Sequence, residues 1–236
     1  MIFTLFMSDI TQLEKKIGVK FKNLDLLLQA VVHRSYLNEH PQFHLDHNER
    51  LEFLGDAVLE LIVTDYLYKN YPNPEGDLTN WRASLVNGDS LAEVAKKLDI
   101  DSHLLLSRGE SKDKNSKARQ YILANALEAV IGAIYLEHGL AQSRKFIEKN
   151  IISKLEQILE QKLYIDPKSY FQEKAQEETG ITPVYKVVSS SGPDHAKIFK
   201  IGVYLDKELV ATGEGSSKQE AQTQAAKYGL QKKNWD

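Results

Sequence analysis

The segment from Asn48 to Leu59 sets three acids into an otherwise apolar run that is typical of a helix. Glu49, Glu52 and Asp56 are spaced so that a helix brings all three carboxylates to one stripe, within about 60° of one another. Like charges crowded among apolar side chains repel each other and lose hydration. A hard divalent cation is the usual compensation, so this stripe is the first candidate for a metal site.

The chain as a whole has the composition of an ordinary globular protein. Its 236 residues leave room for one large domain or two small ones, and 42% hydrophobic residues can form a core. The net charge of −3 gives no global sign of nucleic-acid binding, so any such binding must come from local patches. The sequence has no cysteine, which excludes disulfides and cysteine-ligated zinc or iron–sulfur sites.

The first seven residues are apolar but too few to span a membrane. No basic segment precedes them, no cleavage site follows, and polar Ser8 and acidic Asp9 come next. We therefore reject a signal peptide and a membrane partner and expect a cytoplasmic protein. We interpret the stretch as an irregular start, with Met7 as suitable an initiator as Met1.

Helical spacing dominates from Ile10 to about Ile151. The pattern predicts one helical period over 78–98, a strongly apolar helix over 121–137 and an amphipathic helix over 140–163. The polar stretch 108–117 predicts an exposed loop.

The pattern changes near Pro167, which suits the first turn of a new helix. A helix over 169–179 is followed by alternating segments that predict strands over 184–188, 199–205 and 208–213. A last helix is predicted over 217–231. The order α-β-β-β-α within about 70 residues is enough for a small separate domain.

A second acid-bearing helix contains Asn125 and Glu128, which are three residues apart and share a face between apolar neighbours. If this helix packs beside the first, Glu52, Asp56, Asn125 and Glu128 form an oxygen-only set that suits Mg²⁺ or Mn²⁺ and not zinc. The alternative is that these polar residues lie on a solvated face of each helix. The surrounding apolar residues make this alternative weaker. Gly55 is a poor helix former, which favours close approach of a neighbouring backbone.

Several motifs, in this order, resemble those of the ribonuclease III family: 30–36, 48–59, 75–78, 82–87 and 122–136. The resemblance covers most of the chain. The order of the motifs and the pair of domains resemble the small bacterial type of this family. The resemblance implies a protein of the multi-domain fold class. An all-α endonuclease domain over 8–160 would be followed by an α-β-β-β-α double-stranded RNA-binding domain over 167–236. Residues 161–166 would form the linker.

The resemblance implies a Mg²⁺-dependent endonuclease that cleaves double-stranded RNA as a homodimer, without an organic cofactor. The products would carry 5′-phosphate and 3′-hydroxyl ends, and the substrates would be ribosomal, messenger and other structured RNA precursors. Asp56 and Glu128 match the central catalytic pair. Metal-binding positions are matched by Glu52, Asp56, Asn125 and Glu128, with Glu49 as an accessory acid. Phe53 matches a residue that packs at the dimer interface.

Asn125 departs from the family pattern, in which aspartate is common at this position. Its carbonyl oxygen can still bind a metal but supplies one negative charge fewer, so we expect weaker Mg²⁺ affinity and not a dead site. A second hypothesis remains open: a double-stranded RNA-binding regulator that keeps the fold but cuts slowly or not at all. A third is an all-helical interaction scaffold that binds no RNA.

The C-terminal pattern resembles a double-stranded RNA-binding domain, which reads duplex shape across two minor grooves and the phosphates between them. The resemblance places Gln172 and Glu173 at one minor groove. It places Pro193 and His195 in the loop for the second groove, and Ser217 and Lys218 at the phosphates, helped by the helix dipole.

Two glutamines depart from this pattern. Gln219 stands where a second lysine is frequent, and Gln222 stands where a charged residue is common. We expect one phosphate contact fewer and a salt slope smaller by about one unit. In the endonuclease domain, the basic stretch Arg108–Arg119 either contacts RNA backbone near the active site or only solubilises the loop.

Overall fold

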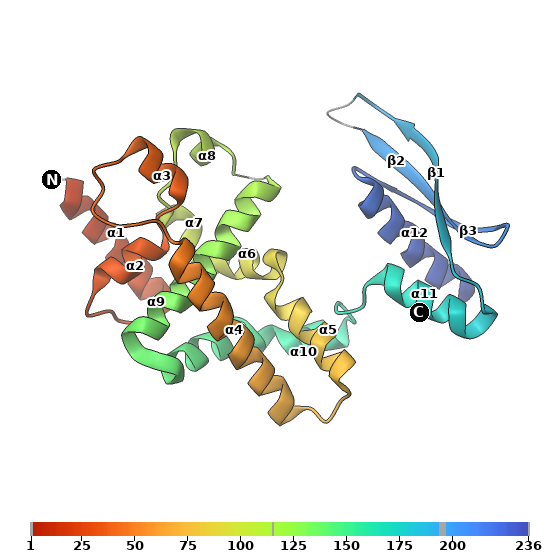
Figure 1. Ribbon diagram of the computed structural model, residues 1–236, viewed down its shortest axis with the longest axis horizontal. Coiled ribbons are helices and arrows are strands. Elements are labelled where there is room, and N and C mark those ends of the chain that lie inside the picture. Colours follow the sequence, from red (N-terminus) through yellow and green to blue (C-terminus); the bar gives the residue numbers. More distant parts are fainter. Residues whose placement is uncertain (1, 115, 194–196, 236) are drawn as a thin grey trace. The chain divides into compact units, whose positions relative to one another are not determined.

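The computed structural model describes residues 2–114, 116–193 and 197–235, with the backbone alone for residues 2–8. The chain forms two compact units, Met1–Gln161 and Lys162–Asp236. The first is helical, and the second contains the only sheet within the described residues (Figure 1). No helix in the described part of the chain is both long enough and apolar enough to cross a membrane.

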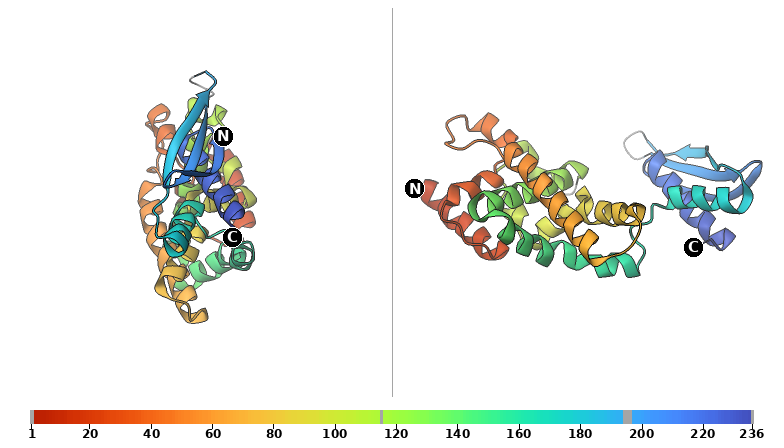
Figure 2. Two further views of the ribbon diagram at one scale, coloured as in Figure 1. Left: turned by 90° about the vertical axis from the view of Figure 1, so that its right-hand side faces the viewer. Right: turned by 60° about the horizontal axis from the view of Figure 1, so that its bottom comes forward.

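The helices of the first unit follow one another with short connections. They are α1 (Ile2–Ile17), α2 (Leu24–Ala30), α3 (Arg34–Glu39), α4 (Glu49–Asn70), α5 (Glu75–Val86), α6 (Gly88–Lys97), α7 (Ile100–His103), α8 (Arg108–Lys112), α9 (Lys117–Asn150), the 3₁₀ turn η1 (Ile152–Lys154) and α10 (Leu155–Glu160). The extensive pairing of α4 with α9 forms the centre of this unit (Figure 2). Leu59, Ile62 and Val63 of α4 and Leu127 and Val130 of α9 are fully buried.

Two glycines permit this pairing. A β-carbon on Gly55 would overlap the carbonyl oxygen of Glu128 and lie 2.8 Å from the backbone nitrogen of Gly132. A β-carbon on Gly132 would overlap the carbonyl oxygen of Leu51. The close backbone approach predicted at Gly55 is therefore confirmed, and its partner is the acid-bearing helix α9.

Three sequence predictions for this unit were wrong. The helical period 78–98 is two helices, because the side chain of Asn87 caps the start of α6 by accepting a hydrogen bond from Ser90 N at 2.9 Å. The predicted loop 108–117 begins with the helix α8, which Ser107 caps. The predicted helix 140–163 is interrupted at Ile151, because the turn into η1 buries both Ile151 and Ile152.

The second unit contains α11 (Pro167–Thr179), β1 (Val184–Ser191), β2 (Ile198–Leu205), β3 (Glu208–Gly215) and α12 (Lys218–Lys233). The strands form an antiparallel sheet in the order β1-β2-β3. Phe171 of α11, Val203 and Leu205 of β2, and Ala225 and Leu230 of α12 belong to one buried core. The predicted α-β-β-β-α order is confirmed.

Candidate functional site

The start of α4 is anchored firmly to the body of the first unit. Asn48, which precedes the helix, is buried; its side-chain amide donates to Ala30 O at 3.1 Å and its backbone N–H to Val32 O at 2.9 Å. The three acids of the stripe follow at once. Glu49 and Asp56 are exposed and Glu52 is half-buried, so the stripe lies at the edge of the helix pair.

Helix α9 places its two polar residues against this stripe. The side chain of Asn125 hydrogen-bonds the carboxylate of Glu52. Glu128, half-buried, has its own backbone against Gly55, one residue before Asp56. The structure therefore brings Glu52, Asp56, Asn125 and Glu128 into one neighbourhood across the α4–α9 contact.

The acids in this neighbourhood perturb one another. Burial raises the pKa of Glu128 to about 7, and the charges of Asp56, Glu52 and Glu60 contribute to the rise. Burial also raises the pKa of Glu52, reinforced by Glu49 and Asp56, while the hydrogen bond from Asn125 opposes it. A carboxyl whose pKa is raised by burial and then by like-charged neighbours marks a site with uncompensated negative charge.

The donor set fits a hard cation by its chemistry, since it consists of carboxylate and amide oxygens. Nearby cations are only partial compensation: Arg82 pairs with Glu60 at 3.1 Å, and Arg34 approaches Glu49 at 3.6 Å. Within the described residues, no three acidic or histidine side chains converge closely enough to hold a metal ion.

Two residues beside Glu49 escaped the sequence analysis. Arg34 reaches it from α3, and His47 Nδ1 lies 3.7 Å from its other oxygen. Neither was singled out from the sequence, and Arg34 appeared only within the family motif 30–36. Neither carries a local signal, because their proximity to Glu49 depends on how the segment before α4 folds back.

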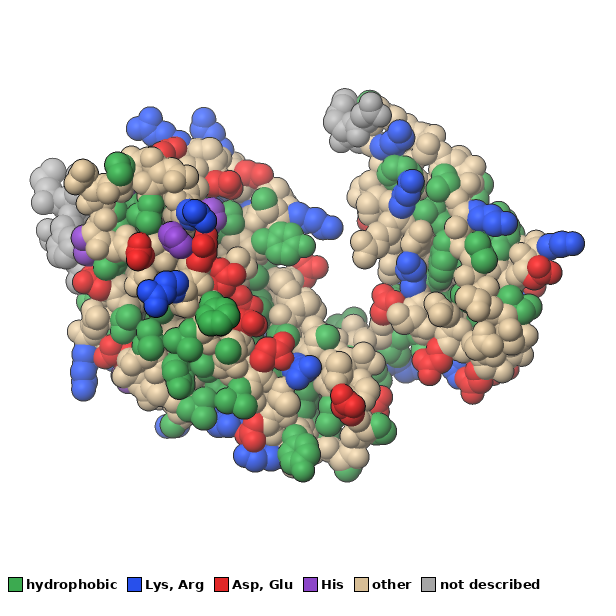
Figure 3. Space-filling model, in the orientation of Figure 1, with side chains coloured by type: hydrophobic (Ala, Val, Ile, Leu, Met, Phe, Trp, Pro, Cys, Tyr) green, Lys and Arg blue, Asp and Glu red, His purple; other side chains and the backbone are tan. Residues whose placement is uncertain are grey.

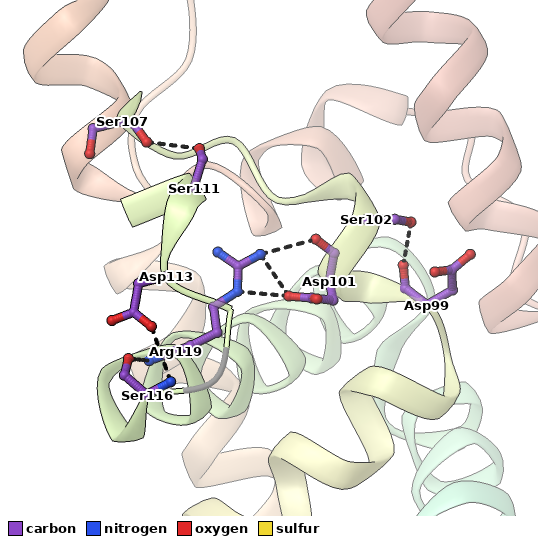
Figure 4. A network of polar contacts seen from close by, with 8 residues as sticks. All are labelled: Asp99, Asp101, Ser102, Ser107, Ser111, Asp113, Ser116 and Arg119. Atoms are coloured by element: carbon purple, nitrogen blue, oxygen red, sulfur yellow. Dashed lines mark hydrogen bonds and ion pairs between the residues drawn. The ribbon is translucent and has the colours of Figure 1, made fainter. Parts of the chain in front are cut away.

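The basic stretch is only partly the exposed loop that was predicted. Arg119 is 6% exposed, and its guanidinium pairs with Asp101 of α7, with Nε at 2.8 Å and Nη2 at 2.7 Å from the same carboxylate oxygen (Figure 4). Ser116 caps α9 by accepting a hydrogen bond from Arg119 N. Arg119 therefore fixes the start of α9, whereas Arg108, Lys112, Lys114 and Lys117 are exposed.

Apolar side chains lie exposed on α4 itself. Phe53 is 81% exposed, Leu61 57% and Tyr68 79%. Figure 3 shows hydrophobic side chains gathered on the face of the first unit that α4 crosses. A stripe of this kind on a monomer is typical of an interaction surface.

In the second unit the predicted RNA-binding residues lie at the surface where they are described. Gln172 and Glu173 are exposed on α11, beside a cavity of about 660 Å³. Pro193 is exposed after β1, and His195 lies outside the described residues. Ser217 caps α12 by accepting from Glu220 N, and Lys218 opens that helix with an exposed side chain.

Matches to family models define the class of each unit. Residues 23–155 match the family described as ribonuclease-III-like, and residues 167–233 match the double-stranded RNA binding motif. The chain belongs to the ribonuclease III family, as an endoribonuclease domain followed by a double-stranded RNA-binding domain.

Relatives and solved structures agree with this assignment. The chain is 44% identical to ribonuclease 3 of Dehalococcoides mccartyi, covering 95% of each chain. It is also 44% identical to ribonuclease 3 of Carboxydothermus hydrogenoformans, over 94% of this chain and 95% of the relative. Among structures, the nuclease domain of ribonuclease III from Campylobacter jejuni is 40% identical with a TM-score of 0.51, over 60% of this chain and 97% of that one.

Proposed function

We propose that this protein hydrolyses phosphodiester bonds of double-stranded RNA with Mg²⁺, leaving 5′-phosphate and 3′-hydroxyl ends. Its substrates would be ribosomal, messenger and other structured RNA precursors in the cytoplasm. The observation that carries the proposal is the backbone contact of Gly55 with Glu128, because it brings acids from two helices into one negatively charged site.

In this proposal Glu52, Asp56, Asn125 and Glu128 hold the cation, with Mn²⁺ as a substitute and Glu49 as an accessory acid. Bound Mg²⁺ would neutralise the phosphate, lower the pKa of a water and stabilise the leaving 3′-oxygen. Asp56 and Glu128 orient the attacking water. Because burial and neighbouring acids raise the pKa of Glu128 to about 7, uptake of a cation below that pH would release the Glu128 proton.

Recognition of the duplex is assigned to the second unit. Gln172 and Glu173 would meet one minor groove, and Pro193 and His195 the next. The N-terminus of α12 would meet the intervening phosphates through Ser217 and Lys218, where free N–H groups and the helix dipole favour an anion. The match of this unit to the double-stranded RNA binding motif supports the assignment.

We propose a homodimer formed through the exposed face of α4. A cavity of about 650 Å³ lies at the far end of that helix, and Thr64, Tyr68 and Tyr71 are among its lining residues. Phe53 and Tyr68 are about 22 Å apart along α4. A two-fold axis between them would place Phe53 of each copy at the partner's cavity. The Campylobacter jejuni structure is described as having a flexible region involved in dimer formation, which supports a dimer here.

The test is incubation of the purified protein with a long RNA duplex, first with Mg²⁺ and then with excess chelator. Short duplex fragments with 5′-phosphate ends are expected only with Mg²⁺. The departure at Asn125 favours one other candidate, a regulator that binds without cutting. Retained binding without Mg²⁺-dependent fragments would establish that candidate and refute the nuclease.

A further inference from the structure

Lys168, near the start of α11, is held in place by neutral groups. Its Nζ donates a hydrogen bond to Gln222 Oε1 at 2.7 Å and lies 5.3 Å from the centre of the Tyr185 ring. The side chain is half-buried. An amide oxygen and an aromatic face orient an ammonium group without cancelling its charge.

Three other lysines of the second unit pair with carboxylates. Lys174 pairs with Glu177 at 2.7 Å, and Lys200 and Lys233 pair with glutamates at 3.0 Å. Within the described residues, no carboxylate forms an ion pair with Lys168. Its position is therefore fixed while its charge stays available.

The two acids nearest in sequence to Lys168 and Gln222 accept hydrogen bonds from local donors, although the charge of Asp166 also acts on Tyr185. Asp166 caps α11, accepting a hydrogen bond from Ser169 N at 2.8 Å. Glu220 Oε2 accepts hydrogen bonds from both N and Oγ of Ser216 at 2.7 Å. Both carboxylates are directed to local donors.

The hydrogen bond to Gln222 holds the ammonium group of Lys168 at one face of α12. In the proposed function, this face contacts the RNA phosphates. Gln222 lies four residues after Lys218, so the two side chains share one face of the helix. Gln219 and Gln222 together were expected to leave this face one phosphate contact short, Gln219 in place of a frequent lysine and Gln222 in place of a charged residue. Because the ammonium of Lys168 donates to the Gln222 amide, α11 supplies a positive charge beside a position of α12 where a charged residue is common.

We propose that Lys168 binds an RNA phosphate beside Lys218, with Gln222 and Tyr185 as positioning residues. This inference rests on the proposed binding of double-stranded RNA. It reverses the expectation of a reduced salt slope, because the contact missing from α12 is supplied by α11.

The test measures binding of the full-length chain to a defined RNA duplex in chelator, over a series of KCl concentrations. Lys168→Gln should reduce the slope of log K against log salt by about 0.7–0.9. That loss corresponds to binding about four- to sixfold weaker at 0.15 M salt, with the difference closing towards 1 M. Restoring a cation with Lys168→Gln combined with Gln222→Lys should restore the slope.

Lys186→Gln is the matched control. Lys186 also lies over a ring, 5.2 Å from the centre of Tyr204, but it is the neighbour of Tyr185 on β1 and so faces the opposite side of the sheet. This variant should keep the wild-type slope. An equal reduction in both variants would overturn the proposal, because it would show a general charge effect.

A second variant covers the possibility that Lys168→Gln unfolds the domain. Gln222→Glu keeps Lys168 but gives it a carboxylate partner, so it should also reduce the slope. An unchanged slope in folded Lys168→Gln, whatever the affinity, would show a structural lysine and overturn the inference. Failure of the wild-type chain to bind duplex at any salt would instead refute the proposed function.

Discussion

Glu128→Gln should stabilise the metal-free protein in a pH-dependent way. The pKa of Glu128 is raised from 4.5 to about 7, chiefly by burial and then by Asp56, Glu52 and Glu60. An unfolded chain ionises this carboxyl near 4.5, whereas the folded chain holds the proton until about 7. Folding stability therefore falls as pH rises between these values and stays reduced above them. Glutamine is neutral at every pH and removes this loss.

The size of the effect follows from the rise in pKa. At 1.36 kcal/mol per pH unit, a rise from 4.5 to about 7 gives a ceiling of about 3 kcal/mol. The carboxyl is half-buried, so screening by water lowers the expected gain to about 1–2 kcal/mol. For a unit of this size, that is an increase of about 3–6 °C in the midpoint of thermal unfolding.

The assay is thermal unfolding of the full-length chain in chelator at pH 5 and pH 8.5. Glu128→Gln should raise the midpoint at pH 8.5 and change it little at pH 5, and saturating Mg²⁺ should diminish or reverse the gain. Glu148→Gln is the control, because Glu148 lies on the part of α9 beyond the kink at Gly139 and approaches Arg144 at 3.9 Å. Equal changes at both pH values in Glu128→Gln would refute the reasoning.

Three further predictions concern the helix pair and its exposed face. Gly55→Ala should destabilise the first unit by about 2 kcal/mol or more, because a β-carbon there overlaps the Glu128 carbonyl. Chemical denaturation measures this loss, and an unchanged free energy of unfolding would contradict the contact. Asn125→Asp should lower the Mg²⁺ concentration for half-maximal cleavage by roughly up to tenfold, since it adds a ligand charge; unchanged Mg²⁺ dependence would show that Asn125 is not a ligand. Phe53→Glu should weaken self-association at least about tenfold in sedimentation analysis, since it charges an 81%-exposed apolar side chain at the proposed interface; an unaltered dimer would place the interface elsewhere.

The sequence predicted features that local pattern controls. A glycine inside an apolar helix indicated a close backbone contact, and the structure places Glu128 against Gly55. Alternating residues predicted the strands of the second unit, and Ile201, Val203 and Leu205, which alternate along 199–205, are buried. These predictions succeeded because periodicity reports which side of an element is covered.

Features that depend on a distant partner could not be predicted in this way. Arg119 was interpreted as part of an exposed loop, but Asp101, eighteen residues earlier, neutralises it and permits its burial. The amphipathic pattern of 140–163 continues through Ile151 without a break, so the sequence gives no sign that the helix ends there. The helix is interrupted because the turn into η1 buries Ile151 and Ile152. Lys168 is similar, because its environment is made by Gln222 and Tyr185 from two other elements.

The central claim is that side-chain oxygens of α4 and α9 hold one catalytic site for a divalent cation. Anomalous diffraction from crystals of the protein grown with Mn²⁺ tests it most directly. The account predicts a peak within coordinating distance of oxygens from both helices, with Asp56 and Glu128 among the ligands. Full Mn²⁺ occupancy elsewhere, with no peak between these helices, would contradict it.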